Sequence, residues 1–362
     1  MFGKAHSIVI SKISGTIEDM CLSVLSQIDA RSVIKISFFG KANGDNEYLC
    51  NFNKLKNAVN TFYTNNAPLV SYIAQESSTG KLVAEVTHIT DDSISIDRHR
   101  NFVILRNAGH SELITGGIIP DDISKSTYEQ AKNIFKGIDK LLKSNNFEPC
   151  DIYRQWNYIQ GITILNDGSQ NYQEFNDARS IFYNSSQWSN GYPAATGIGA
   201  DAGGVMVELF AVKNIDISKP IDNPMQVAAH NYSQRVLDGK AVEGLDQRTT
   251  PKFERARLLK DTIYISGTAA IEGENSVASC NAAEQTAKTM EIMNRLISKD
   301  NIPAMNNGAA YDLLRVYVKR KEDVETVTEF MEQHYSTVAK HYLIADVCRP
   351  ELLVEIEGIA HI

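Results

Sequence analysis

Two carboxylates near the end of the chain stand out because they interrupt an apolar segment. The stretch RPELLVEIEG, residues 349–358, has the composition of a buried strand, yet it carries Glu355 and Glu357. Side chains alternate along a strand, so both carboxyl groups project from the same face. Burying an ionised carboxylate costs several kcal/mol unless it is paired or protonated. Glu355 is therefore either a proton donor held neutral in an apolar wall or a structural, paired carboxylate, and the residues alone leave both roles open.

The overall composition limits what such an acid could act on. The chain has 362 residues, of which 43% are hydrophobic and 22% charged, enough for two or three globular domains. The net charge of −8 and the pI of about 5.6 argue against a nucleic-acid or anionic-membrane partner. An anionic small molecule would have to be held by a local group of arginines.

Nothing in the pattern of cysteines, histidines or glycines suggests a metal or a cofactor. The five cysteines are scattered without a C-x-x-C pair, which fits a reducing cytoplasm, and the eight histidines form no HExxH motif. The segment ATGIGADAGG lacks the Lys-Ser/Thr ending of a phosphate-binding loop. The opening residues MFGKAHSIVISKISG lack a signal-peptide pattern, and no run of about 18 apolar residues occurs. We expect a cytoplasmic protein with no metal, no cofactor and no membrane span.

The elements that must position these residues are organised as an internal repeat. The C-terminal third predicts a strand, helix, strand, helix, strand and strand over residues 261–271, 281–301, 311–320, 322–336, 340–348 and 351–362. The middle third repeats this order over residues 111–119, 126–146, 150–162, 169–184, 192–200 and 203–212. The first hundred residues predict a shortened copy, with a strand, a helix and two closing strands over residues 32–41, 48–63, 67–75 and 80–89.

Particular residues coincide when the copies are aligned. YISGT matches LITGG, DLLRVYV matches DIYRQWNYI, and LLVEIEG matches VMVELFA. Glu85, Glu208 and Glu355 then occupy one equivalent position. Arg154 and Arg315 are also equivalent, and we expect a structural role for both.

The repeat predicts three units, at residues 1–100, 101–225 and 226–362. The polar segment 90–100 and the segment 213–224, with its two prolines, separate them. Strands alternating with helices indicate an α+β fold of mixed sheets backed by helices. We expect the last two strands of each unit to form an antiparallel pair.

The C-terminal repeat resembles the RidA-like (YjgF) fold, in FERARLLKDTIYISGTAAI, LLRVYVKRKEDVETV and VEIEGIA. Single-unit proteins of that kind are normally trimers with sites between subunits, so three units in one chain imply an internal pseudo-trimer, which we expect to be a monomer. Further motifs, namely RQWNYI, NYQEFNDAR, YPAATGIGADAGG, NPMQVAAHNYSQR, FERA, ISGTAAI and CRPELLVEIEG, resemble one branch of this superfamily, the chorismatases. The resemblance implies cleavage of the enolpyruvyl ether of chorismate, with release of pyruvate and a ring product.

Two positions of the resemblance bear on the ring product. One type of chorismatase adds water and gives a dihydroxycyclohexadiene carboxylate, whereas the other forms 3-hydroxybenzoate without net water. Gly267 in ISGTAA and Cys348 in VCRP are similar to the 3-hydroxybenzoate type. The alternative for Cys348 is a buried small hydrophobic side chain.

The resemblance also implies roles for individual residues. Glu355 is expected to protonate the methylene carbon of the enol ether, with a second-line or structural role for Glu357. Arg179 and Arg255 are the candidates for gripping the two substrate carboxylates, with solvated surface arginines as the alternative. Tyr158 is a candidate hydrogen-bond donor to substrate, or else a core residue.

We therefore expect a chorismatase that forms 3-hydroxybenzoate and pyruvate for a secondary metabolite. The alternatives are the hydrolytic type, a RidA-like enamine or imine deaminase, and a protein that binds a carboxylated metabolite without turnover.

Overall fold

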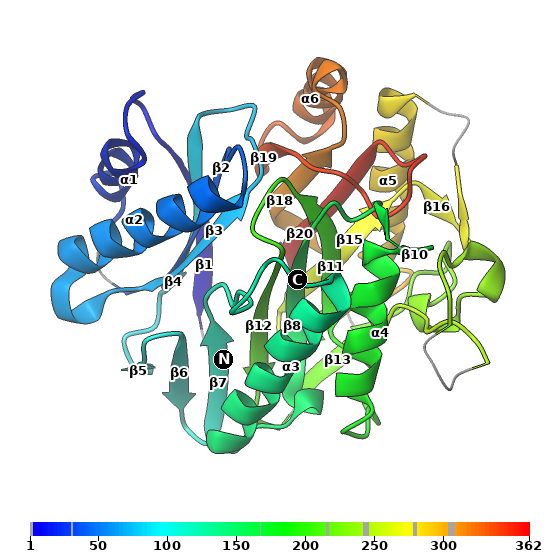
Figure 1. The fold of residues 1–362 in the computed structure, drawn as a ribbon, viewed down its shortest axis with the longest axis horizontal. Coiled ribbons are helices and arrows are strands. Elements are labelled where there is room, and N and C mark those ends of the chain that lie inside the picture. Colours follow the sequence, from blue (N-terminus) through cyan, green and yellow to red (C-terminus); the bar gives the residue numbers. More distant parts are fainter. Residues whose placement is uncertain are drawn as a thin grey trace.

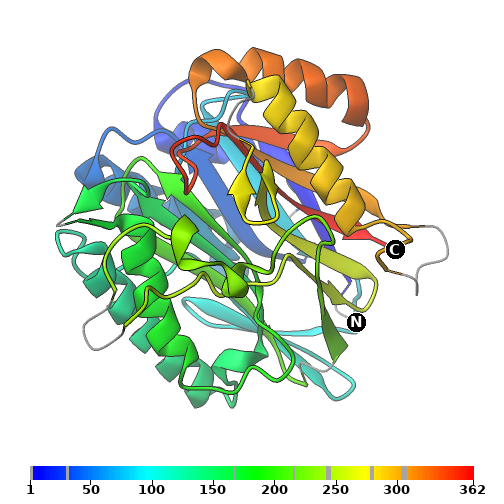
Figure 2. The ribbon, with the colours of Figure 1, turned by 90° about the vertical axis from the view of Figure 1, so that its right-hand side faces the viewer.

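Three β-sheets surround a common centre in a computed structural model of the chain, and each sheet carries a pair of helices on its outer side (Figure 1; Figure 2). The structure describes residues 3–29, 32–166, 168–214, 217–241, 246–277, 281–302 and 308–362. Cys280 lies outside these ranges. No helix of the described part is long and apolar enough to cross a bilayer.

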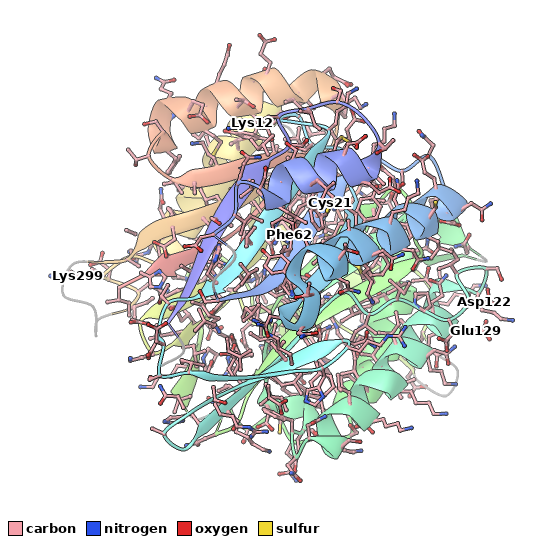
Figure 3. All side chains as sticks on the ribbon, turned by 90° about the vertical axis from the view of Figure 1, so that its left-hand side faces the viewer. Lys12, Cys21, Phe62, Asp122, Glu129 and Lys299 are labelled. Carbon is pink, nitrogen blue, oxygen red and sulfur yellow. The ribbon has the colours of Figure 1, made fainter. Side chains whose placement is uncertain are left out.

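The first sheet has four strands in the order β1-β4-β2-β3. Its elements are β1 (Lys4–Ile10), α1 (Ile17–Leu25), β2 (Val33–Gly40), α2 (Asp45–Tyr63), β3 (Leu69–Ala74) and β4 (Leu82–Ile89). Helix α1 begins where the Thr16 side chain accepts a hydrogen bond from the Asp19 N–H and the Asp19 carboxylate accepts one from the Thr16 N–H. Both helices lie across the outer face of this sheet (Figure 3).

The second sheet has six strands in the order β11-β8-β12-β7-β6-β5. Its elements are β5 (Ser95–Arg98), β6 (Phe102–Asn107), β7 (His110–Thr115), α3 (Thr127–Ser144), β8 (Ile152–Gln160), α4 (Asn171–Tyr183), β11 (Ala194–Ala200) and β12 (Val205–Val212), with a small hairpin of β9 (Leu165–Asn166) and β10 (Ser169–Gln170). The apolar faces of α3 and α4 pack on the outer side of the sheet.

The third sheet also has six strands, in the order β13-β14-β15-β20-β18-β19. Its elements are β13 (Ser218–Ile221), β14 (Ala256–Leu259), β15 (Thr262–Ala269), α5 (Ala282–Leu296), β18 (Ala310–Val318), α6 (Val324–Tyr335), β19 (Ala339–Ile344) and β20 (Val354–His361), with a hairpin of β16 (Ile271–Glu272) and β17 (Asn275–Ser276). The long segment between β13 and β14 crosses from the third sheet toward α4 and includes two short 3₁₀ turns.

The three sheets share one topology. In each, two parallel strands are joined by a helix, as in β2-α2-β3, β8-α4-β11 and β18-α6-β19. The last strand then runs antiparallel to the first of these two, on its other side. The expectation that the last two strands of a unit pair with each other is wrong, because β2, β8 or β18 lies between them. Alternation along a strand identifies its buried face but not its neighbour.

The predicted α+β architecture of repeated units, with mixed sheets backed by helices, is confirmed by this shared topology. The first unit is shorter by its outer strands, and it contains β1 and α1, which the sequence analysis did not assign. Strand β5 belongs to the second sheet and β13 to the third. A division of the chain by sheets would therefore begin the second and third units slightly before residues 101 and 226. The three-unit division stays a prediction.

The side chains form one central core and three outer cores. The outer cores fill the space between each sheet and its helices. The central core takes residues from all three sheets, among them Phe39, Trp156 and Leu343. Charged side chains enter this central region from equivalent strand positions, and they create the site described next.

Candidate active site

The three carboxylates predicted to be equivalent do occupy one strand position. Glu85 lies opposite Ser37 on β2, Glu208 opposite Trp156 on β8, and Glu355 opposite Tyr317 on β18. All three are on the last strand of their unit and all three are buried.

A basic residue recurs two positions before the partner of each carboxylate. These residues are Lys35 on β2, Arg154 on β8 and Arg315 on β18. The registers make Lys35 a third member of the Arg154–Arg315 pair that the sequence predicted. Each unit therefore brings one acid and one base to the centre.

Two of the three acids form ion pairs with a base from a neighbouring sheet. Glu85 accepts hydrogen bonds from Arg315, with 2.8 Å to Nη2 and 3.1 Å to Nε. Glu208 lies 3.0 Å from Nζ of Lys35. Such pairs offset the cost of burying both charges, so Glu85 and Glu208 are structural carboxylates.

The third base does not pair with the third acid. Arg154 instead forms an ion pair with Glu357, which also accepts a hydrogen bond from the Thr196 hydroxyl. The other oxygen of Glu357 lies 2.7 Å from Arg315 and accepts hydrogen bonds from further donors, Trp156 Nε1 at 3.1 Å and Tyr317 Oη at 2.9 Å. Burial alone would raise the pKa of Glu357, but Arg315 and Arg154 hold that pKa below its usual value.

Glu355 is thereby left as a buried acid without a counter-ion. Only 4% of the residue is exposed, and within the described part of the chain no hydrogen bond or ion pair reaches its carboxyl group. Burial and the negative charge of Glu357 raise the pKa of Glu355 from 4.5 to about 8, against a smaller opposing effect of Arg154. The carboxyl group is therefore mostly protonated at neutral pH, which is the state required of a proton donor.

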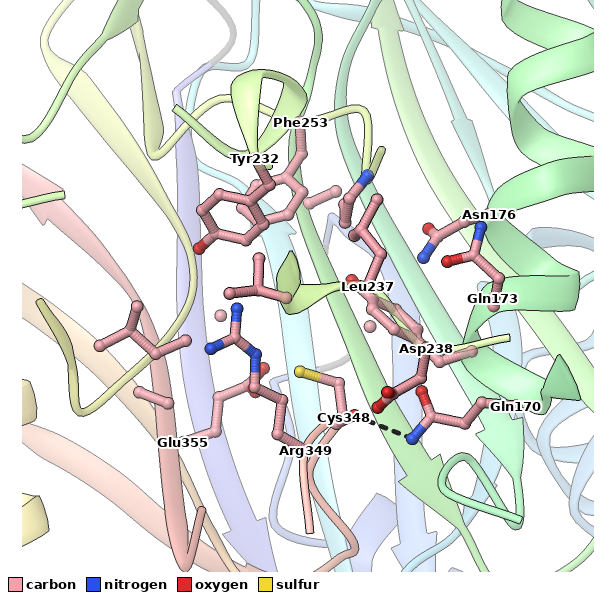
Figure 4. A pocket seen from close by; sticks show the side chains of 18 of the residues that line it. Gln170, Gln173, Asn176, Tyr232, Leu237, Asp238, Phe253, Cys348, Arg349 and Glu355 are labelled. Atoms are coloured by element: carbon pink, nitrogen blue, oxygen red, sulfur yellow. Dashed lines mark hydrogen bonds between the residues drawn. The ribbon is translucent and has the colours of Figure 1, made fainter. Parts of the chain in front are cut away.

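Glu355 lines a pocket between the second and third units (Figure 4). The empty space of the pocket is about 750 Å³, a volume that includes open solvent at its mouth. The second unit contributes side chains from α4 and β11, and the third contributes β15, β20, the segment before β14 and the turn after β19. In Figure 4, Tyr232 and Phe253 lie on one side of the space and Gln173 and Asn176 of α4 on the other. A ligand-sized, largely closed space next to a neutral acid is a suitable place for protonating a small molecule.

Two guanidinium groups line the same pocket. Arg255 donates hydrogen bonds to the Val227 carbonyl at 2.5 Å and to the Tyr232 hydroxyl at 2.7 Å, and Arg349 donates to the Glu274 carbonyl at 2.9 Å. Each guanidinium carbon lies 5.5 Å from the centre of the Tyr232 ring. Within the described residues neither arginine forms an ion pair with a carboxylate, so both positive charges are available to an anionic ligand.

Gly267 faces Glu355 across the pocket wall. A Cβ atom at this position would overlap Oε1 of Glu355 and would lie 3.1 Å from Cγ2 of Thr196. The Gly267 N–H donates a hydrogen bond to the Thr196 hydroxyl at 3.0 Å, which fixes the backbone beside the acid. Any larger residue here must displace the Glu355 carboxyl group.

Cys348 also lines the pocket, but as a thiol. Burial and the nearby Glu355 carboxylate raise the pKa of Cys348 to about 12. Its carbonyl accepts a hydrogen bond from Gln170 at 3.4 Å, which connects the turn before β20 to the start of α4. A thiol with so high a pKa is a poor nucleophile at neutral pH.

Two other predicted site residues lie outside the pocket lining. Tyr158 is 1% exposed, and its hydroxyl accepts a hydrogen bond from Arg315 at 2.8 Å in the central core, so it cannot reach a molecule in the pocket. Arg179 is also 1% exposed and donates to the Asn176 side chain at 2.5 Å. Because Asn176 does line the pocket, Arg179 acts on that space through Asn176 and not by direct contact.

Sequence reasoning missed three features of the site. Arg349 lies in the quoted motif CRPE, directly after Cys348, and was not considered as a carboxylate ligand. Tyr232 stands in the motif HNYSQR and separates the two guanidinium groups. Thr196 of YPAATGIGA joins Arg154, Glu357 and Gly267 in one hydrogen-bonded group. The motifs contained these residues, but only the folded arrangement assigns their contacts.

Comparison with known proteins identifies the family of the chain. A family profile described as chorismatase FkbO/Hyg5-like, N-terminal, matches residues 88–211. A 3-hydroxybenzoate synthase of Streptomyces hygroscopicus is 32% identical over 229 residues, covering 59% of this chain and 64% of that protein. A chorismatase of Streptomyces rapamycinicus is 31% identical over 246 residues, covering 62% of this chain and 68% of that protein. The chain belongs to the chorismatase family.

The fold of the chorismatase family extends over the whole chain. A crystal structure of a chorismatase at 1.08 Å resolution aligns with a TM-score of 0.72 and 23% sequence identity, covering 98% of both chains. The matched regions of the two curated relatives amount to about two thirds of their lengths, so the reaction of this particular chorismatase is proposed from its site below.

Proposed function

We propose that this chorismatase converts chorismate to 3-hydroxybenzoate and pyruvate, with Glu355 as the acid. The observation that carries the proposal is a buried carboxyl group that has no counter-ion among the described residues and lines a pocket with two guanidinium groups that, in the same part of the chain, form no ion pair with a carboxylate. Chorismate has two carboxylates and an acid-sensitive enol ether, so it matches both features. The names of the curated relatives, 3-hydroxybenzoate synthase and chorismatase, support the same reaction.

The Glu355 carboxyl group supplies the proton for the difficult step. Cleavage of the enol ether requires protonation of its methylene carbon, which turns the ether carbon into an oxocarbenium ion. A positioned carboxylic acid with a raised pKa typically accelerates such a transfer by about 10²- to 10⁴-fold. After the transfer, the Glu355 carboxylate lies beside the new cation in a buried site and stabilises it.

Arg255 and Arg349 are proposed to hold the two substrate carboxylates. Guanidinium groups bind carboxylates with two parallel hydrogen bonds, and binding in a buried site makes such bonds stronger than in water. Their existing bonds to backbone carbonyls leave other N–H groups on each guanidinium available, and Arg255 Nε has no partner among the described residues. Arg179 supports this side of the pocket by orienting Asn176.

Gly267 and Cys348 are proposed to direct the cation toward the aromatic product. The absence of a Cβ at Gly267 lets the Glu355 carboxyl occupy its observed position, and with a methyl group there the acid and the substrate would both shift. The shift decides whether the substrate's own C4 hydroxyl or a water molecule lies against the cationic carbon, which is a matter of near-attack geometry. With the C4 hydroxyl in place, its oxygen bonds to the cationic carbon and its proton returns to the Glu355 carboxylate. The C4–O bond then breaks as the C3 proton is removed, which makes the ring aromatic. Pyruvate leaves with the C4 oxygen, and the C3 oxygen stays on the ring and takes up the proton, so there is no net uptake of water.

The proposed function is tested by product analysis in heavy water. Purified protein is incubated with chorismate in D₂O, pyruvate is trapped at once by reduction to lactate, and both products are measured by mass spectrometry. The expected result is 3-hydroxybenzoate together with lactate that carries one deuterium in its methyl group. Glu355→Gln should lower turnover by about 10²-fold or more, whereas Glu208→Gln, the equivalent position in the second unit, should remain active where it folds.

Other outcomes of this experiment would replace the proposal. A dihydroxycyclohexadiene carboxylate would identify the hydrolytic type. Ammonia release from short-lived amino-acid enamines without activity on chorismate would identify a deaminase. Saturable binding of chorismate without turnover would identify a binding protein.

Several wider expectations are part of the same proposal. We propose that the chain acts as a monomer whose three units, residues 1–100, 101–225 and 226–362, replace the subunits of a trimer. We also propose a cytoplasmic location, action on a small molecule without nucleic acid, and a role in supplying 3-hydroxybenzoate to a secondary metabolite.

A further inference from the structure

The position of Glu357 is unique among the three repeats. The residue opposite the central base is Thr87 in the first unit and Phe210 in the second, but Glu357 in the third. The third unit therefore brings two acids to the centre where the other units bring one. Lys35 Nζ of the first sheet lies 5.5 Å from the centre of the Phe210 ring, but neither Thr87 nor Phe210 carries a charge that could form an ion pair with the base of a neighbouring sheet.

We propose that Glu357 is a positioning residue that keeps Glu355 in its acid form by binding Arg154, the base that would otherwise pair with Glu355. This inference rests on the proposed role of Glu355 as proton donor. It assigns to Glu357 a function in the reaction although Glu357 does not touch the pocket.

Counting charges at the centre supports the proposal. The three bases Lys35, Arg154 and Arg315 are balanced by Glu208, Glu357 and Glu85, each of which lies in an ion pair. Glu355 is the additional acid, and none of these three central bases remains for it. Without Glu357, the bases would exceed the paired acids by one, and an ionised Glu355 would restore the balance.

The pairing geometry of the other units shows what Glu355 would do. Glu208 and Glu85, the acids equivalent to Glu355, each form an ion pair with a base of a neighbouring sheet, Lys35 and Arg315 respectively. Arg154 occupies the corresponding place on β8, facing the third sheet, where its guanidinium contacts Glu357 and Thr196. Its Nη1 atom is buried without a hydrogen-bond partner in the described part of the chain, so Arg154 could donate a hydrogen bond to a second carboxylate.

The other groups that face Glu355 do not set its protonation state in place of Glu357 and Arg154. On β20 and β8 the charged neighbours are Glu357 and Arg154. The turn before β20 presents Cys348 and α4 presents Tyr172, and burial keeps the pKa of both far above neutrality, so both are uncharged. The two pocket arginines and Asp238 at the mouth complete the charged lining, and Arg255 and Arg349 bind hydrogen-bond acceptors other than Glu355.

The test compares the pH dependence of kcat/KM for chorismate in the wild type and in Glu357→Gln. In the wild type, activity should fall as Glu355 loses its proton on the alkaline side. In Glu357→Gln this alkaline limb should move to lower pH by about one unit or more, because Arg154 is then free to pair with Glu355. A purely structural role of Glu357 would lower activity at every pH and leave the limb in place, and that result would overturn the proposal.

A second pair of variants removes the released base. In the double variant Glu357→Gln with Arg154→Gln, the charge balance is restored and the limb should move back from its position in Glu357→Gln toward that of the wild type. If Glu357→Gln alone does not fold, Arg154→Gln alone serves instead, and its limb should not fall below that of the wild type. A limb that moves down in Arg154→Gln, or stays down in the double variant, would overturn the proposal.

A measurement without substrate separates this inference from the proposed function. The carbonyl stretch of a protonated carboxylic acid is followed by infrared difference spectroscopy as pH rises, and the Glu355 band is assigned by its loss in Glu355→Gln. The band should persist to higher pH in the wild type than in Glu357→Gln. If chorismate is not turned over but the band behaves in this way, the proposed function fails while the role of Glu357 stands; an identical titration in both proteins overturns the role of Glu357.

Discussion

Replacing Glu355 by glutamine should make the protein more stable, although it removes the proposed catalytic acid. Glutamine has nearly the same shape as protonated glutamic acid and carries no charge at any pH. The wild-type residue, in contrast, must keep a proton in the folded state that it would lose in water, because its pKa is raised from 4.5 to about 8. Folding at neutral pH therefore includes the free-energy cost of protonating this carboxyl group.

The sign and size of the effect follow from the two pKa values. Below pH 4.5 the carboxyl group is protonated in both the folded and the unfolded chain, so it makes no difference to stability. Between pH 4.5 and 8 only the unfolded chain ionises, and the stability of the wild type falls as pH rises. The cost reaches about 3 kcal/mol at pH 7 and levels off at about 5 kcal/mol above pH 8. Glu355→Gln should gain these amounts relative to the wild type.

Urea unfolding of both proteins at pH 5, 7 and 9 measures this difference directly. The control is Glu208→Gln, which occupies the equivalent position but leaves the buried Lys35 without its partner. That variant should lose about 3–5 kcal/mol, because it breaks a buried ion pair from one side. An advantage of Glu355→Gln that does not grow between pH 5 and pH 9 would refute the idea that Glu355 is buried as a neutral acid.

Three further predictions concern the pocket. Gly267→Ala should shift the ring product from 3-hydroxybenzoate toward the dihydroxycyclohexadiene carboxylate, because the added Cβ would overlap the Glu355 carboxyl group. Chromatography of the acids measures the product ratio, and an unchanged ratio would contradict the role of Gly267. Arg349→Met should raise KM for chorismate by roughly tenfold or more through loss of a charged hydrogen-bond donor, and an unchanged KM would remove Arg349 from the binding site. Cys348→Ala should keep turnover within about tenfold of the wild type, measured with chorismate. Iodoacetamide at pH 8 should leave the wild-type Cys348 unmodified, because its pKa is about 12. Rapid alkylation of Cys348 would contradict the raised pKa of this partly buried thiol.

The sequence was sufficient to predict the repeat and the position of its recurring carboxylate. Apolar residues alternating with Glu85, Glu208 and Glu355 placed one carboxylate at the same point of each copy, and the strand registers confirm that equivalence. Alternation also placed Glu355 and Glu357 on one face, with Ile356 directed into the core between the third sheet and its helices. These features depend on local periodicity, which a single sequence contains.

What could not be predicted depends on contacts between distant segments. Arg154 and Glu357 are 203 positions apart, and nothing local indicates that this pair forms in place of Arg154 with Glu355. The order of strands was also missed, because the helix crossover that sets β18 beside β19 leaves no mark on either strand. Tyr158 was expected either to donate a hydrogen bond to substrate or to belong to the core, and its hydroxyl accepts a hydrogen bond from Arg315 in the central core.

Joining three units in one chain has a consequence for how a site of this kind can arise. In a trimer of identical chains, any substitution at the central position appears three times, so an added acid would change all three boundaries at once. In this single chain the additional carboxylate occurs in only one copy, and the two remaining boundaries keep the ion pairs that fasten the sheets together. Two boundaries can therefore hold the sheets together while the third carries the reactive acid. The protein should bind one substrate molecule per polypeptide, where a symmetric trimer would bind three.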